Sequence, residues 1–105
     1  MADREATFAE LIEVLRQAQD AVHRELELRQ RQEFDREALL RLLTYVRSFA
    51  DQALSLFRLM ANSDPDDVPM EKVTNAHELV RSFRATEDRI KAALELGRWG
   101  GCARE

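Results

Sequence analysis

The first third of the chain repeats apolar residues at the spacing of an amphipathic helix. Intervals of three and four residues place side chains on one helical face. The positions in phase are Phe8, Leu11, Leu15, Ala18 and Val22, and the face is widened by Ile12, Val14, Leu26 and Leu28. The next positions at this spacing are Glu25 and Arg29, so the apolar face becomes less apolar toward the C-terminal end of the helix. The pattern predicts a first helix over about residues 4–32.

A wider apolar face follows, in the segment 39–60. Its apolar positions are Leu39, Leu42, Leu43, Tyr45, Val46, Phe49, Ala50, Ala53, Leu56, Phe57, Leu59 and Met60. At 100° per residue they sweep about 220° of a helix, whereas a surface helix needs a stripe of about 100°. We therefore expect a second helix, over about residues 36–62, with more than one neighbour.

The break between these two helices depends on the stretch "EFDRE". Asp35 is a favourable N-cap residue, and Phe34 and Leu39 stand where a hydrophobic staple would form. We therefore expect a turn here. The alternative is one continuous rod of about 60 residues, roughly 90 Å long at 1.5 Å per residue, which would need coiled-coil partners.

The stretch "NSDPDDVP" at residues 62–69 is the clearest loop in the sequence. Asp64 and Pro65 favour a turn, and Pro69 suits the first turn of a new helix. Apolar positions at helical spacing then continue to Gly97, a typical C-cap residue. A third helix is expected over about residues 69–96. The acidic loop lacks the spacing of a twelve-residue calcium loop.

Taken together, the segments predict an all-α fold. We expect three long antiparallel helices in an up-down-up bundle, forming one domain over residues 1–97 that dimerises into a larger bundle. Residues 98–105 are expected to be a loose tail. In that tail, Trp99 either folds back onto the bundle or meets a partner, and Cys102 is an inert thiol.

The composition limits the classes of function. The 105 residues carry a net charge of −4, with no basic block along the chain, so nucleic-acid binding is not expected. The start "MADREATFAE" lacks the pattern of a secretory signal, and no stretch approaches about 18 uninterrupted apolar residues. We expect a cytoplasmic protein with no membrane segment.

The wide face of the second helix is the main indication of function. A slim bundle covers only part of it, so the remainder is expected to meet a second copy of the chain or a target protein. The expected interface residues are Leu39, Leu43, Tyr45, Val46, Phe49, Leu56, Phe57, Leu59 and Met60.

Glu87 occupies an apolar position of the third helix. It is in phase with Val73, Val80 and Leu94, and a buried carboxylate is costly unless it is paired. Arg29 or an arginine of another helix is the expected partner, and the pair would fix register or oligomeric state. The alternative is that the apolar face opens to solvent there.

The string "NAHELVRSFRA" resembles the histidine-phosphotransfer domains, helical bundles with an exposed phosphoacceptor histidine. His77 and Leu79 match that pattern, and the resemblance implies phosphotransfer through His77. Val80 and Arg81 stand where the family usually has Lys and Gly. These departures remove the charge and the space that the phosphoryl group needs, so an ordinary surface histidine is the competing interpretation.

Other candidate chemistry is sparse. Asp20, His23 and Glu27 share one face of the first helix, but the chain has only two histidines and no second ligand motif. We expect a solvated face, no metal and no cofactor. No nucleophile is set beside a base in the sequence, and the chain is not expected to be an enzyme.

The leading hypothesis is a small non-enzymatic module for protein–protein interaction. It would act as a regulator, adaptor, inhibitor or secretion-type chaperone, and most simply as a homodimer. A further alternative is nucleic-acid binding through arginines that a dimer gathers, namely Arg41, Arg47, Arg81, Arg84 and Arg98.

Overall fold

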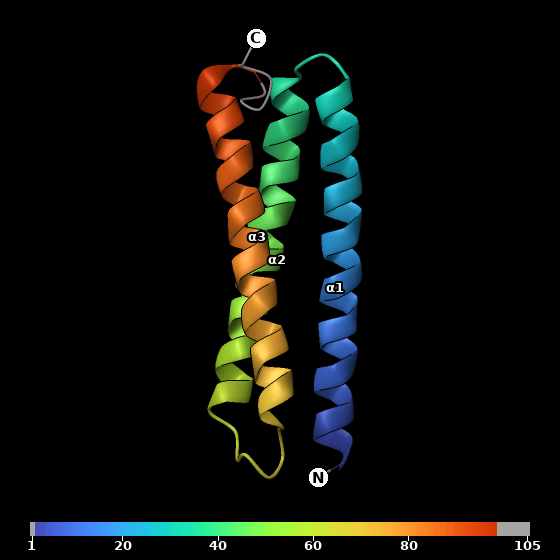
Figure 1. The fold of residues 1–105 in the computed structure, drawn as a ribbon, viewed down its shortest axis with the longest axis vertical. Coiled ribbons are helices and arrows are strands. Elements are labelled where there is room, and N and C mark those ends of the chain that lie inside the picture. Colours follow the sequence, from blue (N-terminus) through green and yellow to red (C-terminus); the bar gives the residue numbers. More distant parts are fainter. Residues whose placement is uncertain (1, 99–105) are drawn as a thin grey trace.

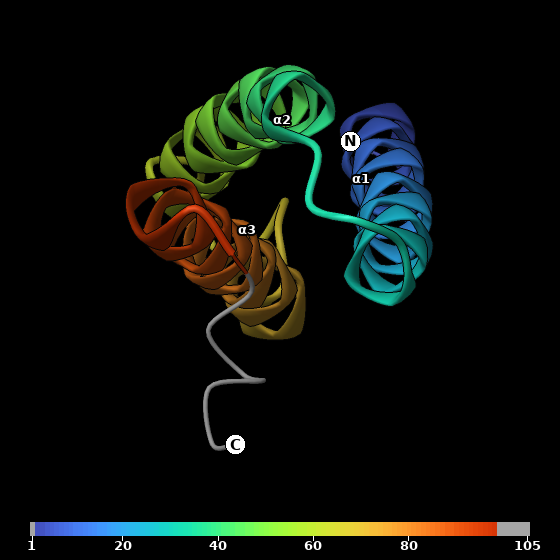
Figure 2. The ribbon, with the colours of Figure 1, turned by 90° about the horizontal axis from the view of Figure 1, so that it is seen from above.

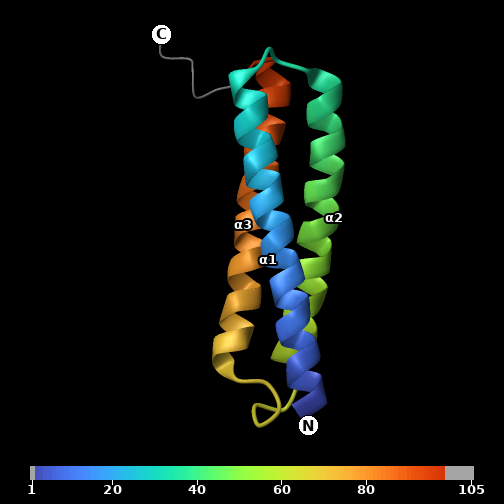
Figure 3. The same cartoon turned by 90° about the vertical axis from the view of Figure 1, so that its right-hand side faces the viewer.

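The computed structural model describes residues 2–98, with side chains from residue 7 onward. It contains α1 (Ala2–Arg31), α2 (Arg36–Ala61) and α3 (Met70–Leu96) and, within those residues, no strand. The helices run up, down and up in one bundle measuring 53 × 19 × 17 Å (Figures 1 and 3). The predicted all-α bundle is confirmed. Trp99 and Cys102 lie outside the described residues.

The turn between α1 and α2 is capped as the sequence predicts. Asp35 has extended backbone angles, φ −127° and ψ 101°, and its side chain accepts a hydrogen bond from the backbone N–H of Ala38. This bond satisfies one of the N–H groups left without a partner at the start of α2. Phe34 and Leu39 both pack into the core cluster. The continuous-rod alternative is therefore excluded.

The loop between α2 and α3 closes on its own acidic residues. The carboxylate of Asp64 accepts from the backbone N–H of Asp66, and the Asp64 carbonyl accepts from Asp67 and Val68. Val68 is buried beneath this loop and anchors it to the bundle. Pro69 is the N-cap of α3 rather than its first residue, so the helix begins at Met70.

Gly97 ends α3 as predicted. Its φ of 71° lies in the left-handed region, which side chains with a Cβ seldom adopt. The backbone N–H groups of Gly97 and Arg98 both donate to the carbonyl of Ala93, which closes the helix end.

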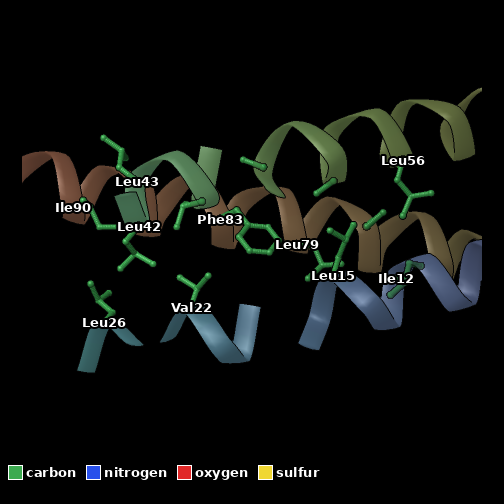
Figure 4. Packing of buried hydrophobic residues seen from close by; sticks show 14 of the residues in the cluster. Ile12, Leu15, Val22, Leu26, Leu42, Leu43, Leu56, Leu79, Phe83 and Ile90 are labelled. Carbon is green, nitrogen blue, oxygen red and sulfur yellow. The ribbon is translucent and has the colours of Figure 1, made fainter. Parts of the chain in front are cut away.

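The core is a single cluster that draws on all three helices (Figure 4). Its most deeply buried large side chains are Leu26 of α1, Leu39, Val46 and Met60 of α2, and Phe83 and Ile90 of α3. Alanines 50 and 53 of α2 and alanine 76 of α3 are completely buried. Small residues at such positions let packed helices approach closely.

The pair α2–α3 packs more closely than either helix packs against α1 (Figure 2). Phe49 and Phe83 stack between α2 and α3, with ring centroids 5.7 Å apart and planes inclined by 29°. Such aromatic pairs add to the stabilisation that comes from burial alone. Helix α1 is therefore packed more loosely against a tightly packed α2–α3 pair.

The inward face of α1 is rotated slightly from the predicted one. The structure buries Phe8, Ile12, Leu15, Val22 and Leu26, and leaves Leu11 exposed. Both sets have helical spacing and differ by a small rotation about the helix axis. At the one polar position within the true face, Gln19 donates a hydrogen bond to the hydroxyl of Ser82 on α3. This cross-helix bond favours the observed rotation.

Candidate interaction surface

The structure divides the nine expected interface residues into three groups. Leu39, Leu43, Val46, Leu56 and Met60 are buried among the chain's own helices, and Phe49 and Phe57 are partly buried against the same core. Tyr45 and Leu59 are 61% and 60% exposed. The expectation that these nine residues form the partner interface needs correction for seven of them, because the chain's own core already covers those.

The exposed apolar surface extends along α1 instead. Leu11, Val14 and Leu28 are 44%, 60% and 50% exposed. With the half-buried Ala18 and the exposed Ala21 they lie at steps of three and four residues, except for the seven-residue step from Ala21 to Leu28, which passes Glu25, so they form a second stripe beside the buried one. We call residues 11, 14, 18, 21 and 28 the outer stripe of α1.

A groove runs between α1 and α2 beside this stripe. It contains two hollows of about 760 Å³ and 430 Å³. The larger is lined by Leu11, Val14 and Leu15 of α1 and by residues of α2 between Thr44 and Leu59. The smaller is lined by Ala18, Ala21, Val22, Glu25 and Arg29 of α1 and by Ala38, Arg41, Leu42, Tyr45 and Phe49 of α2. We call both hollows together the α1–α2 groove.

The two walls of the groove differ in chemistry. The α1 wall is mainly aliphatic, whereas the α2 wall of the larger hollow presents Thr44, Ser48, Gln52 and Ser55 before it reaches Leu59. An apolar strip beside short hydroxyl and amide side chains is typical of a surface that accepts an amphipathic helix. The floor is already packed, since Leu15 and Leu56 belong to the core.

Glu87 lies at the centre of an ion cluster between α2 and α3. Its Oε2 accepts from Arg47 Nε at 3.0 Å and its Oε1 from Arg84 Nη1 at 2.9 Å. Arg84 also bonds Asp51 through Nη2, at 3.2 Å. The prediction that this carboxylate is buried and paired is confirmed. Arg29 is not its partner, because Arg29 bonds Glu25 on its own helix at 2.8 Å.

Two opposing effects set the protonation of Glu87. Burial raises the pKa of its carboxyl group, but the hydrogen bonds from Arg84 and Arg47 and the positive charges of Arg84 and Lys91 together outweigh burial, so the pKa lies below its ordinary value. The pKa of Arg84 is raised, chiefly by its hydrogen bond to Glu87. Glu87 and Arg84 therefore stay ionised at neutral pH.

The ion cluster also orders one wall of the groove. Arg47 and Asp51 line the larger hollow and at the same time contact Glu87 and Arg84 of α3. Two charged side chains of that wall are thereby held by the neighbouring helix. The side of α2 that faces the groove is tied to α3 through them.

His77 is exposed on α3. Its ring lies against Phe57 of α2, with centroids 5.2 Å apart and planes inclined by 46°. Arg81, one turn further along, is also exposed. This contact gives the imidazole a packing role on the surface, and phosphotransfer through it stays a prediction.

The other candidate groups are dispersed. Among the described residues, no three His, Cys, Asp or Glu side chains gather as a metal site would require. In the set formed by Asp20, His23 and Glu27, His23 Nε2 lies 3.5 Å from the hydroxyl of Thr86. Of the five arginines considered for nucleic acid, Arg47 and Arg84 are already engaged by Glu87.

The outer stripe of α1 is the feature that sequence reasoning missed. The predicted pattern places Leu11 on the buried face and Val14 and Leu28 at its margins, whereas all three are exposed; Ala18 packs against the core as predicted. The sequence does contain a signal for this stripe. The apolar residues of α1 form two series at helical spacing, which lie on two faces, whereas a helix packed on one side needs a single apolar face.

None of the helices described is long and apolar enough to span a membrane. Comparison of the chain with protein-family models, curated proteins and solved structures finds no match. The surface chemistry therefore carries the functional argument alone.

Proposed function

We propose that this protein is a non-enzymatic interaction module that binds an amphipathic helix across the α1–α2 groove. The observation that carries the proposal is the apolar surface along the groove: the outer stripe of α1 on one side, and Tyr45 and Leu59 on the other. Exposed apolar side chains that form a continuous strip favour association, whereas scattered ones carry no such meaning.

The dimensions of the surface suit a helix. From Leu11 to Leu28 the outer stripe spans about 26 Å at 1.5 Å per residue, which is nearly five helical turns. A ligand helix lying there meets aliphatic side chains on one flank and the hydroxyl groups of Ser48 and Ser55 on the other. A regulator, adaptor, inhibitor or chaperone would all use such a surface.

Photo-crosslinking at defined positions tests this proposal. Benzoylphenylalanine replaces Tyr45 in the groove or, as a control, Met70, which is 74% exposed at the start of α3. We expect irradiation in cells to give a discrete crosslinked product from position 45 and none from position 70. Equal crosslinking at both positions, or none at position 45, would overturn the proposal.

We also propose a cytoplasmic location for the module. The support is compositional, since a chain with a single cysteine has no internal disulfide to maintain and suits a reducing compartment. Fractionation of cells that express the tagged chain tests this, and recovery outside the cytoplasm would contradict it.

The two alternative functions have simple tests of their own. Transfer of label from a phosphorylated receiver domain to the chain, lost in His77→Gln, would establish phosphotransfer. A gel shift at low salt that weakens in Arg41→Ala or Arg81→Ala would establish nucleic-acid binding. We expect neither signal, because His77 packs on Phe57 and two of the five arginines are engaged in the ion cluster.

A further inference from the structure

We infer that the occupant of this surface is a second copy of the chain, with the outer stripe of α1 packed antiparallel against the same stripe of its partner. The inference rests on the proposed function and identifies the partner. Three properties of α1 carry it: the period of the stripe, the sizes of its side chains and the charges beside it.

The period of the stripe is that of a coiled-coil seam. Positions 11, 14, 18, 21, 25 and 28 alternate between steps of three and four residues, and a sustained alternation of this kind lets two helices pack along their length. The polar member is Glu25, whose Oε2 is held by Arg29 Nε at 2.8 Å. Its charge is thus compensated within the same helix.

The sizes of the side chains favour an antiparallel pairing of like helices. The stripe carries leucines at both ends, Leu11 and Leu28, and alanines in the middle, Ala18 and Ala21. When the α1 helices of two copies lie antiparallel with the midpoints of their stripes aligned, Leu11 of one copy lies level with residue 28 of the other. The alanines then face each other at the centre, where small side chains allow close approach.

The charges beside the stripe select the same orientation. On the side of α1 away from α2, the heptad positions flanking the stripe hold Glu10, Gln17, Arg24 and Arg31. The acidic residue stands in the N-terminal half and the basic residues in the C-terminal half. In this register an antiparallel partner sets Glu10 within about two residues, roughly 3 Å along the helix axis, of residue 31 of the other copy, twice over by symmetry.

A parallel pairing lacks this match. In a parallel pair the two copies of this flank lie on opposite sides of the interface, each facing the flank that holds Leu15 and Val22, so Glu10 and residue 31 do not meet. In the antiparallel arrangement the two copies of α1 overlap over about 24 residues, or roughly 36 Å. Tyr45 and Leu59 of α2 border the same surface and extend its apolar area.

A charge-reversal cycle tests the inference. Light scattering and sedimentation equilibrium of the full chain are expected to show a dimer. Glu10→Arg and Arg31→Glu each raise the dimer Kd, by about tenfold, because each substitution acts twice in a symmetric pair. The double variant Glu10→Arg/Arg31→Glu returns the Kd close to the wild-type value. No rescue in the double variant would overturn the antiparallel arrangement.

Disulfide trapping gives a second readout that does not depend on affinity. In a Cys102→Ser background, Leu11→Cys and Leu28→Cys chains of different mass are mixed and oxidised. The expected product is the mixed 11–28 disulfide in excess of either homodisulfide. Homodisulfides alone would indicate parallel pairing and contradict the inference.

Different results would contradict the interaction function and the second copy as its partner. A clean monomer at all concentrations, together with crosslinking of another protein from position 45, would overturn the second copy as occupant while the interaction function stands. A clean monomer with no crosslink from position 45 would overturn both.

Discussion

The α2–α3 pair and α1 contribute to the same bundle in different ways. Helices α2 and α3 carry fully buried alanines, and the stack of Phe49 on Phe83 and the ion cluster around Glu87 join them. Helix α1 adds one apolar face and the bond from Gln19 to Ser82, and keeps a second apolar stripe in solvent. The difference separates a part of the molecule built for stability from a part available for binding.

The largest expected effect falls in the α2–α3 pair. Phe83 is 1% exposed and stacks on Phe49. Replacing it in Phe83→Ala removes the ring and leaves a cavity between two rigid helices, so we expect a loss of about 3–5 kcal/mol in the free energy of unfolding. Urea denaturation followed by circular dichroism measures it. A loss below about 1 kcal/mol would show that this pair is not the rigid half.

A truncation of a buried leucine in α1 is expected to cost less. Leu26 is 2% exposed and belongs to the inward face of α1. We expect Leu26→Ala to lose about 2–3 kcal/mol, near the low end for such substitutions, because α1 packs less closely and relaxes into the space. The same urea experiment applies. A cost equal to that of Phe83→Ala would remove the proposed difference between the two regions.

The ion cluster is expected to contribute less than the aromatic stack. Glu87→Gln weakens two charge-assisted bonds, but Arg47 and Arg84 are partly exposed and recover hydration, so we expect a loss of about 1–2 kcal/mol at pH 7. Glu87→Leu serves as the control, because an apolar replacement removes the cost of burying the charge. A larger loss in the leucine variant would contradict this account.

The contribution of Glu87 depends on pH with a defined sign. Its pKa in the folded chain lies below the ordinary value of 4.5. The stabilisation is therefore complete above about pH 4.5 and is lost as the pH falls through the lower, folded value. The difference in unfolding free energy between wild type and Glu87→Gln should shrink on acidification. If the difference in unfolding free energy instead grows as the pH falls, the pKa of Glu87 is not lowered in the folded chain.

The smallest effect on folding is expected on the outer stripe. Val14 is 60% exposed, so Val14→Ala should change the unfolding free energy by no more than about 0.5 kcal/mol when the chain is dilute enough to be monomeric. Urea denaturation at low and high concentration separates folding from association, because association stabilises the folded chain by mass action. A loss above about 1.5 kcal/mol at low concentration would show that Val14 belongs to the core.

Local signals in the sequence predict most of the fold. Asp35 caps α2 and Gly97 ends α3 because their side-chain chemistry and backbone freedom act within a few residues. The burial of Glu87 follows from its phase with apolar neighbours along one helix. Such features need no knowledge of how the helices pack.

The wrong assignments all concern relations between helices. Leu11 and Ile12 both fit the spacing of a buried face, and only the packing of α1 against α2 and α3 selects Ile12. Arg29 is a reasonable partner for Glu87 by charge, yet the alignment of the bundle brings Arg47 and Arg84 there instead. Helix periodicity is a property of one segment, whereas rotation and alignment belong to the assembly.

The most direct test of the central claim compares two charge insertions by sedimentation equilibrium. Val14→Glu places a charge on the outer stripe, and Leu40→Glu places one at an exposed leucine of α2 that lines neither hollow of the groove. We predict that Val14→Glu raises the dimer Kd at least tenfold and that Leu40→Glu leaves it unchanged. Equal association in both variants and the wild-type chain would contradict the claim.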